Sequence, residues 1–404
     1  MPVASGMEPV DLADPATYEP NVPLAWFDQA RESEPLHWRQ SAHLDRGFWV
    51  GLTSGLFDRV FSDPKLFSSS EGTVTLDDPK GLELEKRRLF LINMDPPRHS
   101  AFRRIVARAF KDDAVEALGA KIDGFTAEIF RQTPRGEAVD ITRSLANDLP
   151  LRVMCELLGA DPKDRLRLGA DAEVMNFPED PDLHPAQANL PISVTRLFHY
   201  GVELCEAQRR RPTDSVVSLL SAGEVGGDGL TTEEFCFFFL FILVAAFITT
   251  KSMLTSTIQL LASHPDQLRR LKRQPEQIPI AVEEILRLEP PHIYHCRTAL
   301  RPVSIGGATI EPGQKIALFY HAINRDPALN ADPSAFDVAR TEVRHRSFGR
   351  GIHHCLGALL ARREMVSVVR HIVAHDLELV DCGPPVRARS TFLHSFKEYR
   401  AVIA

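Results

Sequence analysis

The chain has 404 residues, of which 44% are hydrophobic and 25% are charged, so its composition is that of a folded globular protein with a large core. Its formal net charge of -7 gives no support for a nucleic-acid partner, because neutralising phosphates needs a basic surface. The six cysteines are scattered and contain no CxxC pair, a pattern that argues against a disulfide framework and fits a reducing cytoplasm.

The N-terminus has no basic segment followed by an apolar stretch, so no signal peptide is predicted. We expect residues 1–10 to form a flexible tail. No internal repeat, low-complexity tract or shift in composition marks a linker, which predicts one domain over residues 1–404.

Short strand patterns and longer helical patterns follow along the chain. A strand is expected at 47–51, helical apolar spacing at about 102–169, and further strands at 303–310 and 315–320. The apolar run 236–248 is shorter than the roughly 18 residues of a membrane span, so we expect a buried core helix and no span. Patterning alone therefore indicates a helix-rich protein with small sheets to one side.

The loop at residues 348–357, FGRGIHHCLG, sets one cysteine among glycines just before a helical pattern. Glycine lets the backbone approach a flat ligand closely, and a helix N-terminus stabilises a thiolate. Both features suit a thiolate ligand to iron. Two plainer interpretations remain open at this point: a structural cysteine in a turn, or a zinc site of His353, His354 and Cys355, although adjacent ligands lack the usual zinc spacing.

This loop resembles the haem-binding signature of the cytochrome P450 superfamily, FxxGxxxCxG, with Phe348, Gly351, Cys355 and Gly357 at its positions. Three further segments resemble that family in the expected order. They are MDPPRHSAFR at 94–103, EILR at 284–287 and PSAFDVAR at 333–340. The resemblance covers nearly the whole chain and implies a mainly α fold with small β-sheets, in which a long helix lies over the haem and the cysteine loop beneath it.

The resemblance also implies haem b as the cofactor, with the Cys355 thiolate as the proximal iron ligand. The other residues that it assigns to the cofactor are His99, Arg103, Arg297, His353, Phe348, Gly349 and Gly357, the first four by way of the haem propionates. Glu284, Arg287 and Arg340 would form a buried network that locks the core on the haem side.

The helix over the haem departs from the family pattern AGxxTT, in which an acid precedes the first threonine. Thr249 and Thr250 are retained as the catalytic candidates, but Ala246 replaces the glycine and Ile248 replaces the acid that relays protons. Four hypotheses stay open: a monooxygenase with protons delivered through waters ordered by Thr249, a peroxide-driven enzyme, an isomerase or dehydratase, and a haem-binding sensor without turnover.

The resemblance implies an oxidoreductase that inserts one atom of O2 into a hydrophobic small molecule. Residues 47–50 and 67–72 look like bacterial members that oxidise sterol or terpenoid side chains, with fatty acids and biosynthetic intermediates as alternatives. By position, the substrate-pocket candidates are Val74, Leu76, Ala246, Ile293, Phe392 and Leu393.

Electrons would come from NAD(P)H through a ferredoxin or flavodoxin and its reductase. A basic patch is expected to dock this acidic partner, and it comprises Arg103, Arg104, Arg108, Lys111, Arg344, Arg346, Arg362 and Arg363. We expect a cytoplasmic monomer.

Overall fold

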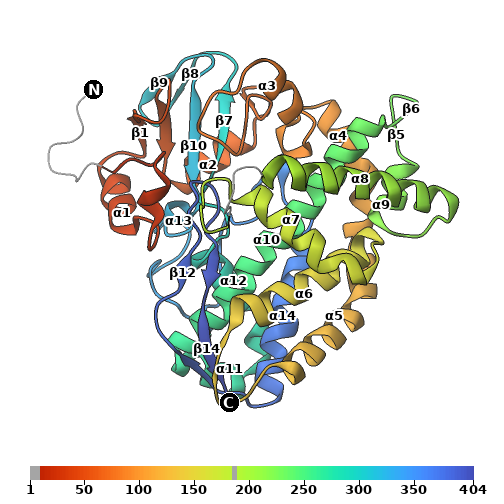
Figure 1. Ribbon diagram of the computed structural model, residues 1–404. Helices are drawn as coiled ribbons and strands as arrows, with labels where there is room; N and C mark the ends of the chain where they lie inside the picture. The colour runs from red at the N-terminus through yellow and green to blue at the C-terminus, as the bar shows by residue number, and fades with distance from the viewer. Residues whose placement is uncertain (1–9, 184–188) are drawn as a thin grey trace.

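The computed structural model describes residues 10–183 and 189–404, so the expected N-terminal tail lies almost wholly outside the described residues. The described part is mainly helical with small sheets, as the sequence predicted. Figure 1 shows β1, β7 and β10 together in the upper left of the view, while most of the long helices fill the centre and right.

The helices are α1 (Leu24–Ser33), α2 (Ser54–Phe61), α3 (Gly81–Arg87), α4 (Arg98–Val106), α5 (Asp112–Gln132), α6 (Ile141–Leu158), α7 (Arg165–Asn176), α8 (Asn189–Arg210), α9 (Val216–Ser221), α10 (Thr232–Ser263), α11 (Pro265–Arg273), α12 (Ile278–Leu288), α13 (Tyr320–Ile323) and α14 (Ala358–Ala374). The strands are β1 (Leu36–Arg39), β2 (Phe48–Gly51), β3 (Phe67–Ser68), β4 (Ala138–Asp140), β5 (Glu224–Val225), β6 (Asp228–Gly229), β7 (Tyr294–Ala299), β8 (Val303–Ile305), β9 (Ala308–Ile310), β10 (Lys315–Phe319), β11 (Leu379–Asp381), β12 (Val386–Arg387), β13 (Phe396–Glu398) and β14 (Arg400–Ile403).

The expected strands and helices are confirmed. The segment 303–310 forms the hairpin of β8 and β9, and its turn uses positive φ at Gly306 and Gly307. The predicted helical region divides into α4, α5, α6 and the start of α7. The sequence reasoning missed β4, which lies between α5 and α6 and pairs with β14 from the far end of the chain.

Helix α10 is the central element of the helical part. Thr231 and Glu234 cap its N-terminus reciprocally, and the helix continues for 32 residues against α6, α7, α8, α12 and α14. It is long and apolar enough to cross a membrane, yet 72% of its most apolar window is buried inside the fold. The expectation of a core helix at 236–248 is therefore confirmed, because a helix that is apolar all round must be covered.

The sheets hold the rest of the core. A five-stranded sheet has the order β1-β2-β10-β7-β3, in which β10 pairs parallel with β2 and antiparallel with β7. Buried apolar side chains form one large cluster among the helices and two smaller ones on this sheet. The site described next takes residues from the large helical cluster and from one of the two clusters on the sheet.

Candidate cofactor and substrate site

The loop before α14 is a tight turn that glycine makes possible. Gly349 and Gly351 have φ angles of 71° and 67°, a region that other residues rarely adopt. A Cβ atom on Gly351 would lie 2.5 Å from the carbonyl oxygen of Phe61. The amide of Cys355 donates to the Phe348 carbonyl at 2.8 Å, which closes the loop. The backbone therefore fixes the position of the cysteine.

Cys355 lines an internal cavity. Its exposed surface faces this cavity. Burial raises the pKa of this thiol, while the Gly357 amide and the cations Arg103 and Arg362 act in the opposite direction. The thiol is therefore protonated near neutral pH, and a metal ion that bound here would displace the proton.

The cavity lies between α10 and the cysteine loop and is lined by residues of both, among them Phe241, Thr249 and Cys355. Most of the wall is apolar, including Leu91, Phe241, Ala245 and Leu360, as a hydrophobic ring system requires.

Four predicted polar residues converge on one side of this cavity. The rings of His99 and His353 lie 4.1 Å apart, and Arg103 and Arg297 line the same space. Both ring nitrogens of His99 are buried without a partner among the described residues, and burial, together with nearby Arg103, lowers the pKa of His99 to about 4. Burial likewise lowers the pKa of His353.

Two guanidinium groups, the His353 imidazole and the His99 imidazole, whose nitrogens have no partner among the described residues, suit the carboxylates of a ligand. Haem b carries two propionates on an apolar ring, so this set of residues fits the cofactor that the sequence implied. Phe348, Gly349 and Gly357 also line the cavity, so all eight predicted cofactor residues are brought together.

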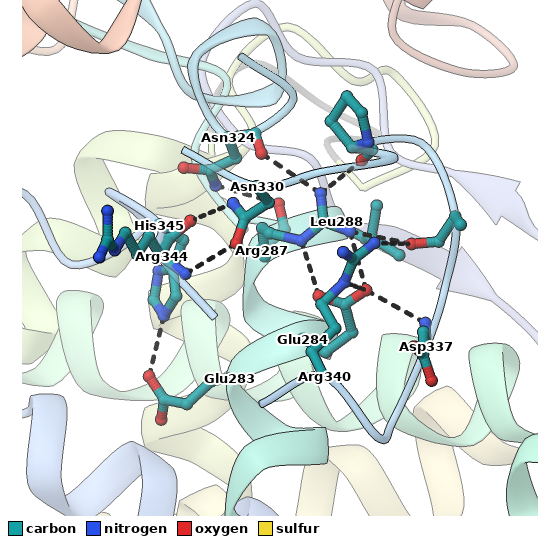
Figure 2. A network of polar contacts seen from close by, with 12 residues as sticks. Glu283, Glu284, Arg287, Leu288, Asn324, Asn330, Asp337, Arg340, Arg344 and His345 are labelled. Atoms are coloured by element: carbon teal, nitrogen blue, oxygen red, sulfur yellow. Dashed lines mark hydrogen bonds and ion pairs between the residues drawn. The ribbon is translucent and has the colours of Figure 1, made fainter. Parts of the chain in front are cut away.

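The predicted Glu284, Arg287 and Arg340 network is present and buried. The Glu284 carboxylate accepts from Arg287 Nε at 2.7 Å and from Arg340 Nε at 2.8 Å (Figure 2). Arg287 also donates to the backbone carbonyls of Asn324, Pro333 and Ala335, so each of its five N–H groups has a partner. Full satisfaction of these groups is what allows ionised side chains to be stable without water.

This network continues into the cysteine loop. The Asn324 side chain donates to the Arg287 carbonyl at 3.0 Å and to Ser347 Oγ at 2.9 Å, and it accepts from the Arg346 amide at 2.7 Å. Ser347 Oγ in turn donates to the Leu286 carbonyl at 2.7 Å. The residues just before Phe348 are therefore held against α12 by hydrogen bonds.

On α10, the cavity wall includes Ala245, Ala246, Thr249 and Thr250. Thr249 Oγ1 donates to the Ala245 carbonyl at 2.7 Å. Ile248, which stands where the family has an acid, does not line the cavity; it is fully buried in the helical core. The side chain at this position is therefore apolar and packed in the core.

The residues predicted for the substrate pocket lie in different parts of the structure. Ala246 lines the cavity, but Val74, Leu76, Ile293, Phe392 and Leu393 do not. Leu76 and Ile293 are buried in a cluster on the sheet, and Leu393 is buried in the helical cluster. Phe392 stands behind His292, with ring centroids 4.9 Å apart. The Ile293 amide donates to the Phe392 carbonyl at 2.8 Å, which joins these two segments.

The cavity wall also holds polar residues outside the predicted set, among them His292, His295 and Glu364. His295 and Arg297 lie two apart on β7, so strand alternation could have placed His295 beside the predicted Arg297. Glu364 is buried on α14 and its Oε2 has no partner among the described residues; burial raises its pKa to about 8, so it is neutral at pH 7. No local motif distinguishes it.

The basic patch is smaller than predicted. Arg344, Arg346, Arg362 and Arg363 are paired with Glu342, Asp58, Glu283 and Asp123, respectively, and Arg103 donates to the His354 carbonyl at 2.6 Å. Arg104, Arg108 and Lys111 are exposed and have no ion pair within the described residues. Within the predicted patch, the cations without an ion pair among the described residues are therefore those around the end of α4.

Comparison with known proteins agrees with this geometry. The cytochrome P450 family model matches residues 202–375. A steroid C26-monooxygenase of Rhodococcus jostii is 30% identical over 97% of this chain and 84% of its own. The linalool 8-monooxygenase of Pseudomonas putida is 29% identical over 98% of this chain and 99% of its own length. The structure of Mycobacterium marinum cytochrome P450 CYP268A2 in complex with pseudoionone matches with a TM-score of 0.89 and 27% identity, over 98% of this chain and 100% of its own. The chain belongs to the cytochrome P450 family and is accordingly a haem b monooxygenase that takes electrons from NAD(P)H through a redox partner.

Proposed function

We propose that this enzyme oxidises a terpenoid-like or sterol-like substrate, with Cys355 holding the haem and Thr249 ordering water for proton delivery. The observation that carries the proposal is the apolar wall of α10 around Thr249, in the same cavity as the Cys355 thiol. The names of the steroid and linalool monooxygenases among its relatives support this class of substrate. Haem, when bound, supplies the activation of O2 from which one oxygen atom enters the substrate.

The protein side chains have separate tasks in this proposal. Arg103 and Arg297 bind the propionates as cations, and His99 and His353 donate to them as neutral imidazoles. Glu284, Arg287 and Arg340 position the cysteine loop through Asn324. We further propose that the chain is a single domain, since the large helical cluster and one cluster on the sheet both contribute residues to this one cavity.

The substrate class is tested by titrating ferric enzyme with terpenoids, steroids and fatty acids and recording the change in iron spin state. A shift to high spin with linalool or a steroid, but not with a fatty acid, is expected. Turnover with hydrogen peroxide alone at a rate equal to the rate with NAD(P)H and redox partners would instead favour a peroxygenase.

Proton delivery through Thr249 predicts uncoupling when its hydroxyl is removed. Because Ile248 offers no carboxylate, Thr249→Val is expected to reduce product formed per O2 consumed about ten-fold or more, since positioned proton transfer is typically worth about 10²–10⁴ in rate. Oxygen consumption should continue, with peroxide as the by-product. The measurement is the ratio of product to O2 consumed.

Thr257→Val is the matched control, because the Thr257 hydroxyl bonds the Met253 carbonyl on the same helix and does not line the cavity. Its coupling ratio should equal that of the wild type. If the ratio of product to O2 consumed were unchanged in Thr249→Val, proton delivery would have to depend on a group other than Thr249.

The free cations around α4 predict the docking site of the redox partner. Arg104→Glu with Arg108→Glu is expected to slow reduction by an acidic ferredoxin about ten-fold at low salt, and the difference should vanish at high salt as charges are screened. Arg301→Glu, an exposed and unpaired residue between β7 and β8, is the control. Equal slowing by this control would mean that net charge, and not a docking patch, governs reduction.

A further inference from the structure

We propose that His292 is a specificity-determining residue, which hydrogen-bonds a hydroxyl or carbonyl oxygen that the substrate carries away from the carbon to be oxidised. This inference rests on the proposed function, since it names the chemical group by which the terpenoid-like or sterol-like substrate is oriented. The family pattern used above assigns no role to this position, and the sequence reasoning chose its neighbour Ile293.

His292 is held rigidly at the cavity wall. Its backbone pairs with Leu393 in an isolated antiparallel bridge, and its ring packs against the rings of Phe392 and His295, with centroids 4.9 Å and 4.8 Å away. The ring is half-buried and lines the cavity. Neither ring nitrogen has a hydrogen-bond partner within the described part of the chain. A ring fixed by aromatic packing, with open nitrogens, is prepared to bind a polar group.

The surrounding wall gives this ring its selectivity. Much of the lining on α10 and before α4 is apolar, including Leu91, Ile92, Phe241, Ile242, Ala245 and Ala246. A substrate with a hydrocarbon body fits against these residues. A polar oxygen on the same molecule loses its hydrogen bonds to water on entering the cavity, and the His292 imidazole can replace them. The ring therefore favours the orientation in which that oxygen lies at His292.

The charge state of the ring favours a neutral oxygen. Burial lowers the pKa of His292 to about 4, so the imidazole is neutral at pH 7 and offers one donor and one acceptor. An alcohol can use both and a ketone can accept from the donor, whereas a carboxylate would gain no counter-charge. Fatty acids are thus poorer partners than oxygenated terpenoids or steroids.

His295 is a different case. Both of its ring nitrogens are sealed from the cavity and have no partner among the described residues. Burial lowers its pKa, and His292 and Arg297 lower it further. The His295 ring packs against the His292 ring with their planes tilted by 50°. In the proposal, His295 therefore holds His292 in place and does not itself bind the substrate.

The experiment uses the haem-loaded full chain and two pairs of probes that differ by one oxygen. Linalool is compared with its deoxy analogue 3,7-dimethylocta-1,6-diene, and cholest-4-en-3-one with cholest-4-ene. Dissociation constants come from the spin-state shift of wild type, His292→Leu, His292→Asn and Phe392→Leu. For each variant, the dissociation constant of the oxygenated probe is divided by that of its deoxy analogue. A change in the cavity wall that weakens both probes equally does not alter this ratio.

In His292→Leu, the preference for the oxygenated member is expected to fall about ten-fold, the loss of one to two neutral hydrogen bonds. His292→Asn should retain part of the preference, because the amide also donates and accepts. Phe392→Leu, which alters the packing and keeps the imidazole, should weaken both members equally.

An unchanged preference in His292→Leu would overturn the inference while leaving the proposed function intact. A nitrogen-ligated ferric spectrum in the wild type that disappears in His292→Leu would also overturn it, because His292 would then be an iron ligand. If no terpenoid or steroid shifts the spin state of the wild type, the proposed function fails and the inference fails with it.

Discussion

Cys355→Ser is expected to abolish monooxygenase turnover and to remove the strongly red-shifted Soret band of the reduced carbonyl complex. A thiolate donates far more electron density to iron than a hydroxyl, and that donation favours O–O cleavage. Serine is similar in size to cysteine, and its backbone amide can keep the hydrogen bond to the Phe348 carbonyl. The loop should therefore keep its shape, and haem should still bind through the propionate contacts. The measurement is the carbonyl spectrum together with the rate of product formation.

Cys382→Ser is the matched control, because Cys382 is also an exposed free cysteine but lies in the turn after β11, outside the cavity wall. Its spectrum and turnover should equal those of the wild type. Retention of the red-shifted band in Cys355→Ser, in protein that is fully loaded with haem, would show that another group ligates the iron.

Glu284→Ala is expected to cost about 3–5 kcal/mol of unfolding free energy, because it leaves the buried charges of Arg287 and Arg340 without their carboxylate. Glu284 and Arg287 have no exposed side-chain surface, and Arg340 is 11% exposed. No water can replace the lost partner at Arg287. Chemical unfolding of the haem-loaded protein, followed by both protein fluorescence and haem absorbance, measures the change.

The two signals should also separate in this variant. Since Asn324 and Ser347 connect the network to the cysteine loop, haem release is expected at a lower denaturant concentration than loss of the helical core. Glu342→Ala, which breaks only the exposed pair with Arg344, should leave both midpoints unchanged. Coincident midpoints in Glu284→Ala would contradict a link between the network and the loop.

The cofactor half of the site could be predicted because local motifs encode it. The turn at Gly349 and Gly351 and the helix that carries His99 and Arg103 each depend on residues within ten positions of one another. Such spacings survive as sequence patterns. Fold class followed for the same reason, since the long apolar run of α10 and the short strands before α14 are visible without any tertiary information.

The substrate half could not be predicted, because it depends on how distant segments meet. His292 and not Ile293 faces the cavity, owing to backbone contacts of this turn with residues about 100 positions later. The basic patch was overestimated for a similar reason. Arg346 is neutralised by Asp58, and Arg363 by Asp123, and neither partner is near in sequence. Glu364 became notable only when packing left it buried without a counter-charge.

The residues that line the cavity come from positions between Phe61 and Glu364, so nearly all of the chain must be synthesised before haem can bind. Cofactor loading is therefore one of the last steps in producing this enzyme, and until then its apolar walls are exposed to water, which is unfavourable and makes the chain a target for chaperones and proteases. Because haem binds only the folded form, its concentration sets how much folded protein persists. A cell short of iron should consequently contain less of this polypeptide, and not merely an inactive stock awaiting its cofactor.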